Sequence, residues 1–244
     1  KTGAIDFNNR RPMTSVYETE HRVLATLRSK HYFFGADKPT TFTLIYERKS
    51  GLPAYPTFDT FTGWTGDYKT KAFGYDYNLN DDSSSMLYIP TRNDPKVCYS
   101  YKCYTEGSAD AIAREKAVLD LLYGVFGLEG KAGQIADRGS MTFPSQTSLD
   151  FKVTQILPGF RADDEFIITL GIENLLNLID DDKGVVRYGY YSGRIPVIDL
   201  RIVDGDKYDY SRNAYRYNFD NPYNMSLSAT QSVWRAQLGF KYNF

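Results

Sequence analysis

The C-terminal segment of the chain alternates strictly between apolar and polar side chains. From Trp234 to Phe244, the even positions are Trp, Ala, Leu, Phe, Tyr and Phe, and the odd positions are Arg, Gln, Gly, Lys and Asn. A period of two predicts a β-strand whose two faces meet different surroundings. A strand that is apolar on one face, polar on the other and aromatic at its end is typical of a membrane barrel. An edge strand of a soluble β-sandwich alternates as well and is the alternative interpretation.

Four earlier stretches alternate in the same way, at residues 21–34, 41–49, 148–157 and 165–174. Each has about the 9–11 residues that a tilted membrane strand requires. Together with residues 232–244 they predict an all-β fold with about five antiparallel strands.

The connections between these strands alternate between short and long. Residues 35–39 and 158–164 form short turns, whereas residues 50–147 and 175–231 form long connections. Outer-membrane barrels have short periplasmic turns and long extracellular loops, and loops this long are uncommon in a compact soluble domain. If the C-terminus is periplasmic, both short turns are periplasmic and both long loops extracellular. Because the smallest membrane barrels have about eight strands, we expect residues 1–244 to be the C-terminal part of a larger transmembrane barrel.

One helix is expected within the first long loop, at residues 108–124. Its N-cap would be Ser108 or Asp110, and Gly124 would end it. Much of its apolar stripe would consist of Ile112, Leu119, Leu122 and Tyr123. The remainder of both long loops is expected to be wet surface loop.

Composition narrows the class of protein. The net charge of −1 gives no bulk attraction to nucleic acid, so no nucleic-acid partner is expected. No apolar run approaches the about 18 residues that a membrane helix needs, but alternating barrel strands average out in hydropathy and are compatible with this. Gly-x-Ser-x-Gly, His-Glu-x-x-His and Walker-type motifs are absent from the sequence. We therefore predict no enzymatic activity and no cofactor.

The two cysteines, Cys98 and Cys103, are separated by four residues. This spacing allows a local disulfide, which an exported protein would favour, and free thiols are the alternative. Two cysteines alone make a poor zinc site.

Several short strings occur in an order that resembles a known family. They are Glu20–Ala25, Leu44–Pro53, Met86–Thr91, Gly133–Gly139, Ser148–Gln155 and Glu173–Leu178. In this order they resemble the C-terminal barrel of TonB-dependent outer-membrane receptors, in particular the Oar-like (OmpA-related) group of Bacteroidota and myxobacteria. The resemblance extends from Tyr17 to Phe244. In the last strand, Gln237, Gly239, Tyr242 and Phe244 resemble the C-terminal signal for outer-membrane assembly.

The resemblance implies a barrel of about 22 strands, with a plug and a TonB box N-terminal to these residues. It implies outer-membrane localisation and as partners the membrane lipid, the barrel assembly machinery, the remaining barrel and plug, TonB, and surface lipoproteins or other proteins. The leading hypothesis is a transporter or receptor that moves a large substrate such as a peptide, protein or glycan. The alternatives are a surface adhesin or scaffold barrel that displays its long loops, and a soluble β-rich binding module.

Candidate ligand-binding residues are fewer. Oxygen-rich clusters of the kind that bind calcium occur at Asn177 and Asp180–Asp182, and at Asp76, Asn78, Asn80, Asp81 and Asp82, but neither has EF-hand spacing, and solvated loop tips are favoured. His21 and His31 are ten residues apart, and an interface role is favoured over metal binding. Eight tyrosines of the second long loop form either a contact surface for peptides or glycans, or a self-packed loop with an interfacial aromatic girdle: Tyr188, Tyr190, Tyr191, Tyr208, Tyr210, Tyr215, Tyr217 and Tyr223.

Overall fold

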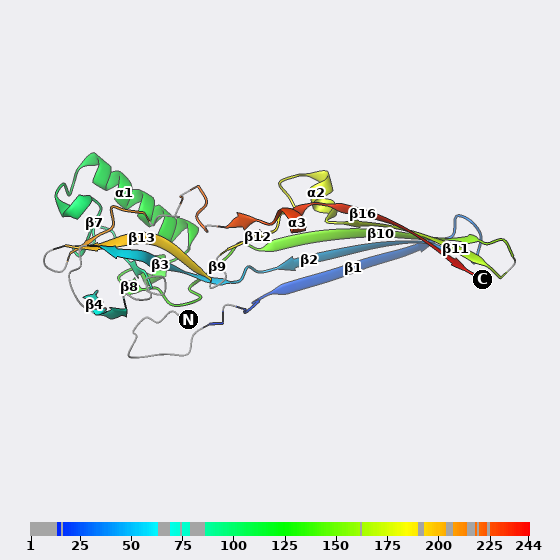
Figure 1. The fold of residues 1–244 in the computed structure, drawn as a ribbon, viewed down its shortest axis with the longest axis horizontal. Helices are drawn as coiled ribbons and strands as arrows, with labels where there is room; N and C mark the ends of the chain where they lie inside the picture. The colour runs from blue at the N-terminus through cyan, green and yellow to red at the C-terminus, as the bar shows by residue number, and fades with distance from the viewer. Residues whose placement is uncertain are drawn as a thin grey trace. The chain divides into compact units, whose positions relative to one another are not determined.

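The structure is a computed structural model that describes residues 14–15, 17–62, 69–73, 75–78, 86–161, 163–189, 193–203, 207–213, 218, 220–223 and 225–244. Most of its elements are β-strands in antiparallel sheets, which confirms the predicted all-β class (Figure 1). The chain divides into two compact units. We name them the sheet unit (Thr19–Gly51, Pro144–Tyr188 and Ser226–Phe244) and the loop unit (Lys1–Glu18, Leu52–Phe143 and Gly189–Met225).

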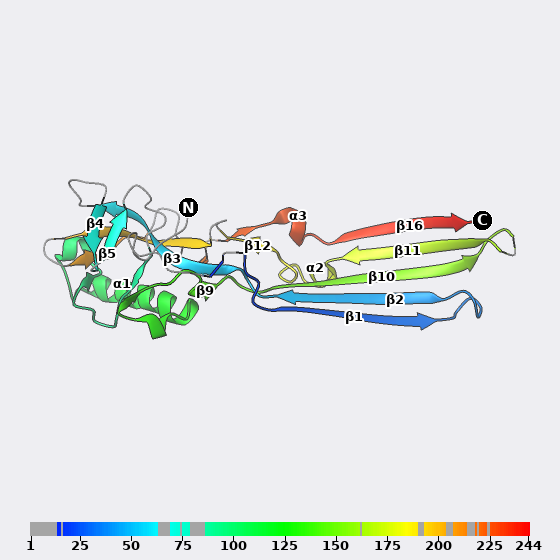
Figure 2. The same ribbon diagram turned by 90° about the horizontal axis from the view of Figure 1, so that it is seen from below.

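The sheet unit contains all five strands that the alternation predicts. They pair in the order β1-β2-β10-β11-β16, and every pairing is antiparallel. Figure 2 shows the turns β1–β2 and β10–β11 at the same end of this sheet as the C-terminus, as the alternation of short and long connections requires. The strand bounds are Arg22–His31 for β1, Thr40–Lys49 for β2, Gln146–Pro158 for β10, Glu165–Glu173 for β11 and Arg235–Asn243 for β16.

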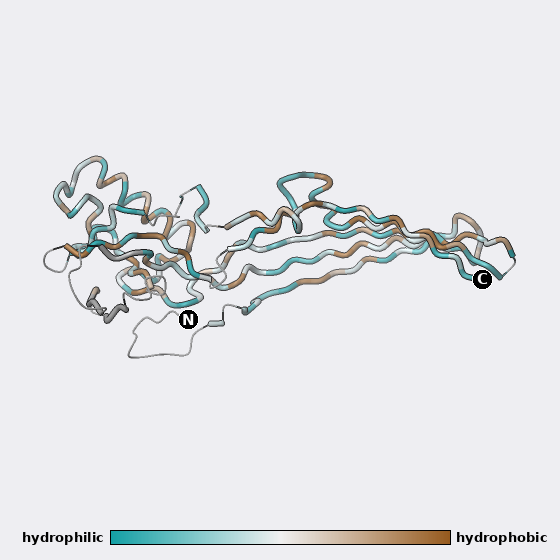
Figure 3. Tube along the Cα trace, viewed as in Figure 1, coloured by the Kyte–Doolittle hydropathy of each residue, from teal (hydrophilic) through white to brown (hydrophobic). Residues whose placement is uncertain are grey.

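The pairing register collects apolar side chains on one face of this sheet. Phe151 lies opposite Leu44 on one side and Ile172 on the other, and Leu170 lies between Val153 and Leu238. Since directly opposed residues point to the same face, these rows form one apolar face, and Figure 3 shows the resulting alternation along each strand. Its apolar members are Val23, Ala25, Leu27, Phe42, Leu44, Tyr46, Leu149, Phe151, Val153, Leu157, Phe166, Ile168, Leu170, Ile172, Ala236, Leu238, Phe240 and Tyr242.

The opposite, polar face carries mainly charged, threonine and amide side chains, with Leu24, Ile45, Ile156 and Ile167 as aliphatic exceptions.

Small elements complete the sheet unit. They are α2 (Leu175–Ile179), α3 (Ala229–Ser232) and the pair β12 (Arg187–Tyr188) and β15 (Ser226–Leu227).

The loop unit is a folded body, which corrects the expectation of long wet loops with a single helix. Its largest sheet has the order β7-β14-β13-β3-β9. The strands are β7 (Val97–Cys98), β14 (Tyr208–Asp209), β13 (Arg194–Ile202), β3 (Pro53–Thr62) and β9 (Met141–Thr142). Two smaller sheets pair β4 (Lys69–Ala72) with β5 (Tyr75–Asn78), and β6 (Tyr88–Ile89) with β8 (Gln134–Ile135).

The central pair of this sheet, β3 and β13, is parallel and joins the two long loops to each other. From Ile195 to Arg201 every residue of β13 is buried. A strand that is buried on both faces is a continuous apolar run rather than an alternating one, so a search for alternation misses it. The register shifts after Pro196, whose nitrogen has no hydrogen to donate to the neighbouring strand.

The hydrophobic core of the described residues lies entirely in the loop unit. Met86, Leu87, Tyr88 and Ile89, which belong to the first long loop, are buried in it. The aromatic rings of Phe58, Phe73, Tyr88, Tyr99, Tyr208 and Tyr210 contribute much of its volume. The long loops therefore form a unit with a hydrophobic core of its own.

The predicted helix is present as α1 (Ala109–Leu119), with the Ser108 hydroxyl accepting from the backbone N–H of Ala111. It continues into a π-helical turn, Asp120–Val125, and Gly127 at φ +70° follows, so Gly124 does not end it. Ile112 is 58% exposed and faces away from the core. Short 3₁₀ turns occupy Tyr101–Cys103 and Glu129–Lys131. Among the described residues, no helix is long and apolar enough to span a membrane.

Candidate functional site

The apolar side chains on the apolar face of the sheet unit are exposed or half-buried: most are exposed on the edge strands β1 and β16 and half-buried on the central strands β2, β10 and β11. Among the described residues, the sheet unit has no buried hydrophobic side chain, and Leu27 and Phe240 are 69% and 71% exposed. Exposed contiguous apolar surface of this extent is rare on a soluble monomer and marks a contact surface. Transfer of such a face to an apolar medium is favourable by about 25 cal/mol per Å².

Aromatic rings gather at the turn end of this sheet. The ring centroid of Tyr242 lies 4.6 Å from that of Phe166 and 5.9 Å from that of Phe160, while Phe244 lies 6.3 Å from Tyr242. The Tyr242 hydroxyl donates to the carboxylate of Asp164 in the β10–β11 turn. This contact fixes an amphipathic ring where the apolar face meets the polar turn.

The β1–β2 turn carries further aromatic residues at the same end. His31 stacks on Phe33 at 5.6 Å and meets the edge of Phe42 at 5.8 Å. Tyr32 and Phe34 are exposed beside them. We call this set and the rings around Tyr242 the aromatic band. His21 lies before the first residue of β1 and 3.5 Å from Glu20, so the two histidines do not share a site.

The residues that resemble an assembly signal divide between the two faces of β16. Gln237 lies opposite Gly171 and Gly239 opposite Thr169 on the polar face, whereas Tyr242 lies opposite Phe166 on the apolar face. A Cβ at Gly239 would come no closer than 3.9 Å to Thr169, so packing within this sheet does not require glycine there. In the described sheet β16 is an edge strand, and it pairs with β11 alone.

The acidic cluster after β11 is a hydrogen-bonded turn. The Asp180 carboxylate accepts from Lys183 Nζ at 3.0 Å and from the Asp182 backbone N–H at 3.1 Å, and the hydrogen bond from Lys183 lowers the pKa of Asp180. The Asn177 amide donates to the carbonyls of Asp181 and Lys183. In the described part of the chain, these carboxylates do not converge on a cation site.

The second acidic cluster is only partly described. Asp76 and Asn78 belong to strand β5, with the backbone alone described, and Asn80, Asp81 and Asp82 lie outside the described residues. The tyrosines divide similarly. Tyr208 and Tyr210 are buried in the loop unit, Tyr223 packs against its core, and Tyr188 is exposed in the sheet unit. For the first three, self-packing is the observed role. Tyr190, Tyr191, Tyr215 and Tyr217 lie outside the described residues.

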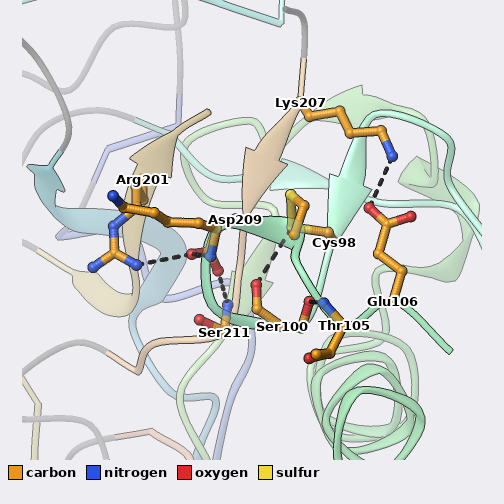
Figure 4. Close-up of a disulfide and its surroundings, with 10 residues drawn as sticks. Cys98, Ser100, Thr105, Glu106, Arg201, Lys207, Asp209 and Ser211 are labelled. Carbon is orange, nitrogen blue, oxygen red and sulfur yellow. Dashed lines mark hydrogen bonds and ion pairs between the residues drawn. A yellow bond between two sulfur atoms is a disulfide. The ribbon is translucent and has the colours of Figure 1, made fainter. Parts of the chain in front are cut away.

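Cys98 and Cys103 form a disulfide in the loop unit, with an S–S distance of 2.03 Å (Figure 4). Lys102 and Cys103 have positive φ angles of 49° and 60°. The buried Asp209 carboxylate accepts from the Lys102 backbone N–H at 2.9 Å and thereby holds this loop. The group of Cys98, Cys103 and Glu106 lacks thiolate ligands for a metal because both sulfurs are bonded to each other.

An ion pair that sequence reasoning missed stands beside the disulfide. Arg201 Nη1 donates to Asp209 at 3.1 Å, the Ser211 backbone N–H donates to the same carboxylate at 2.7 Å, and the Arg201 guanidinium lies 4.4 Å from the centre of the Tyr101 ring. The sequence indicated this pair only through Arg201, a charged residue within a largely apolar strand, because its partner Asp209 lies on a different strand.

Tyr99 yields a prediction for the loop unit. Its hydroxyl is buried and has no hydrogen-bond partner among the described residues, and burial, with the charge of Glu115, raises its pKa. Because the folded state keeps the proton that the unfolded chain loses above about pH 10, stability is fully present below that pH and falls as the pH rises further. We expect Tyr99→Phe to stabilise the unit by up to about 1 kcal/mol and to make this alkaline decline shallower, in thermal unfolding monitored between pH 7 and 11.

Tyr88→Phe is the matched control, since the Tyr88 hydroxyl donates to Asp94 at 2.9 Å. Loss of that hydrogen bond is expected to cost about 1 kcal/mol at neutral pH. Equal destabilisation by both substitutions would show that the Tyr99 hydroxyl has a partner.

Comparison with known proteins identifies no relative of this chain. No protein-family model, curated protein or solved structure matches the chain. The support for a function therefore comes from the exposed apolar face, the aromatic band and the folded loop unit.

Proposed function

We propose that the sheet unit crosses a bacterial outer membrane as part of the wall of a TonB-dependent transporter barrel that moves a large substrate, such as a peptide, protein or glycan. The observation that carries this proposal is the exposed apolar face opposite a polar face across all five strands. A barrel wall needs this arrangement, because lipid contacts one face and the wet lumen the other.

The strand lengths support membrane crossing. The five strands have 9 to 13 residues each, and a tilted membrane strand needs about 9–11. A β-sandwich would instead bury its apolar face against a second sheet, whereas no described side chain of the sheet unit belongs to the hydrophobic core. This contrast favours the barrel over the soluble binding module.

The proposed orientation follows from the two ends of the sheet. The aromatic band at the turn end suits a membrane–water interface, where aromatic rings are enriched. The short turns and the C-terminus would then be periplasmic, and the loop unit, formed by the two long connections, extracellular. The disulfide between Cys98 and Cys103 is compatible with that oxidising location. Energy coupling through TonB, with a plug N-terminal to these residues, rests on the resemblance in sequence.

Removal of Phe244 tests the assembly signal. Phe244 is 97% exposed and packs little, so its loss should affect recognition by the assembly machinery more than the stability of the sheet. We expect its deletion to lower the amount of folded protein in isolated outer membranes severalfold. Membrane fractionation followed by immunoblotting measures this amount.

Phe160→Ala is the control, since Phe160 is 86% exposed within the same aromatic band but lies outside the signal. It should leave the outer-membrane level close to that of the unmodified protein. Equal levels after both changes would contradict the assembly-signal assignment, and recovery of the unmodified protein in the aqueous fraction would contradict the barrel.

A surface adhesin or scaffold barrel is the second candidate, favoured by the observation that the long loops form a folded unit with its own core. Inactivation of TonB distinguishes the two candidates. A transporter loses substrate uptake while its surface binding persists, whereas an adhesin keeps its full function.

A further inference from the structure

Four exposed cations lie on the polar face of the sheet unit, in the half nearer the short turns. They are Arg28 and Lys30 on β1, Lys152 on β10 and Lys241 on β16. Among the described residues, none of them forms an ion pair. Two other cations of this sheet unit do form ion pairs, Arg22 with Glu47 at 2.9 Å and Lys38 with Glu165 at 3.0 Å. We call the four residues the cationic band.

The register places these charges in rows without a carboxylate. Thr43 lies directly opposite both Arg28 and Lys152. The next row along the strands joins Lys30, Thr41, Thr154, Thr169 and Gly239, and the row after it contains Ile156, Ile167 and Lys241. Strand spacing separates Arg28 from Lys152 by about 10 Å, and two residues of strand separate Arg28 from Lys30 by about 7 Å.

The separations among Arg28, Lys30 and Lys152 are comparable to the Debye length of about 8 Å at physiological ionic strength, so these three cations repel one another and are only partly screened. A ligand with several negative charges removes this repulsion and gains attraction at each contact, whereas a neutral ligand gains neither. Charge complementarity therefore specifies an anionic occupant for this face.

We propose that the cationic band binds an acidic polypeptide segment in an extended conformation, carried by the substrate. In an extended chain, carboxylates at alternate residues fall on one face about 7 Å apart, which matches the spacing of Arg28 and Lys30. The Thr43 hydroxyl, directly between Arg28 and Lys152, donates and accepts hydrogen bonds with a peptide backbone. This inference rests on the proposed function, because the polar face lines the lumen only in a barrel.

The test uses the full-length protein in lipid nanodiscs and a fluorescent peptide of alternating Glu and Thr. The peptide should bind with an affinity that falls as salt rises from 50 to 300 mM, and the same peptide with Gln for Glu should not bind. The variant Arg28→Gln/Lys152→Gln should weaken binding at least about threefold, the effect expected for losing two exposed charge pairs. The charge-conserving variant Arg28→Lys/Lys152→Arg should retain it.

Arg22→Gln/Lys49→Gln is the control. Arg22 and Lys49 lie opposite each other on the same polar face, outside the cationic band. The double variant removes the same amount of positive charge and should leave the affinity for the Glu peptide within about twofold of the unmodified value. Equal weakening by both double variants, or equal binding of the Glu and Gln peptides, would overturn the proposal. Tighter binding of polygalacturonate than of the Glu peptide would reassign the band to anionic glycans and overturn it as well. Failure of the proposed function is distinguishable, since the protein would then not enter nanodiscs or outer membranes.

Discussion

Leu170→Arg is expected to remove most of the protein from the outer membrane. Leu170 lies in the middle of β11 on the apolar face, between Val153 and Leu238. If this face contacts lipid, a guanidinium there costs about 2–4 kcal/mol at the bilayer midplane, which is a large part of the stability of a typical folded protein. Heat-modifiable migration in gel electrophoresis and urea unfolding in lipid vesicles measure the folded fraction.

Thr169→Arg is the matched control for this prediction. Thr169 is the preceding residue and points to the polar face, where the opposing Gly239 leaves space for a longer side chain. The folded fraction should remain close to that of the unmodified protein. A soluble sheet would give a different result, with both variants equally abundant in the aqueous fraction, and that outcome would refute the proposed membrane contact.

Asp209→Ala is expected to have an effect of similar size, and it acts on the loop unit. Asp209 is 1% exposed and accepts hydrogen bonds from Arg201, the Lys102 backbone and the Ser211 backbone. Its removal leaves the buried Arg201 guanidinium without its anion, which costs about 3–5 kcal/mol. We expect faster proteolysis and faster hydrogen exchange around the disulfide loop, with the strands of the sheet unit unchanged.

Two variants bracket this effect. Glu106→Ala removes an exposed ion pair with Lys207, 2.8 Å apart in the same region (Figure 4), and should cost less than about 1 kcal/mol. Arg201→Met/Asp209→Leu replaces both buried charges and should be milder than Asp209→Ala, because no unpaired charge is left. If Asp209→Ala proved no more sensitive to protease than Glu106→Ala, the ion pair would have no structural role.

The alternating strands were predictable because successive side chains of a strand point to opposite faces, so the polarity of each residue indicates the face on which it lies. In residues 165–174, Phe166, Ile168, Leu170 and Ile172 alternate with polar neighbours, and β11 is found at Glu165–Glu173. The short turns also account for two of the pairings, β1 with β2 and β10 with β11, because strands joined by a short turn pair with each other. Of the candidate site, the spacing of the cysteines allowed the disulfide that the structure contains.

The loop unit was not predictable in the same way. β13 is buried on both faces and does not alternate, and its partner β3 is separated from it by most of the chain. Met86–Ile89 is a short apolar run without alternation, so the local pattern did not distinguish it from the surrounding loop. Arg201 and Asp209 likewise lie on different strands and become partners only through the fold.

The sequence by itself determined the five strands, their apolar and polar sides and the amphipathic last strand, because a period of two along the chain is a local property of a pleated strand. Only the tertiary structure decided that the long loops fold into one unit, that Tyr208 and Tyr210 are core residues, and that four cations without an ion pair among the described residues lie in the same half of the polar face. Those features depend on strand register and on contacts between segments that are distant in sequence. The local pattern of any one segment does not determine which distant segment it contacts.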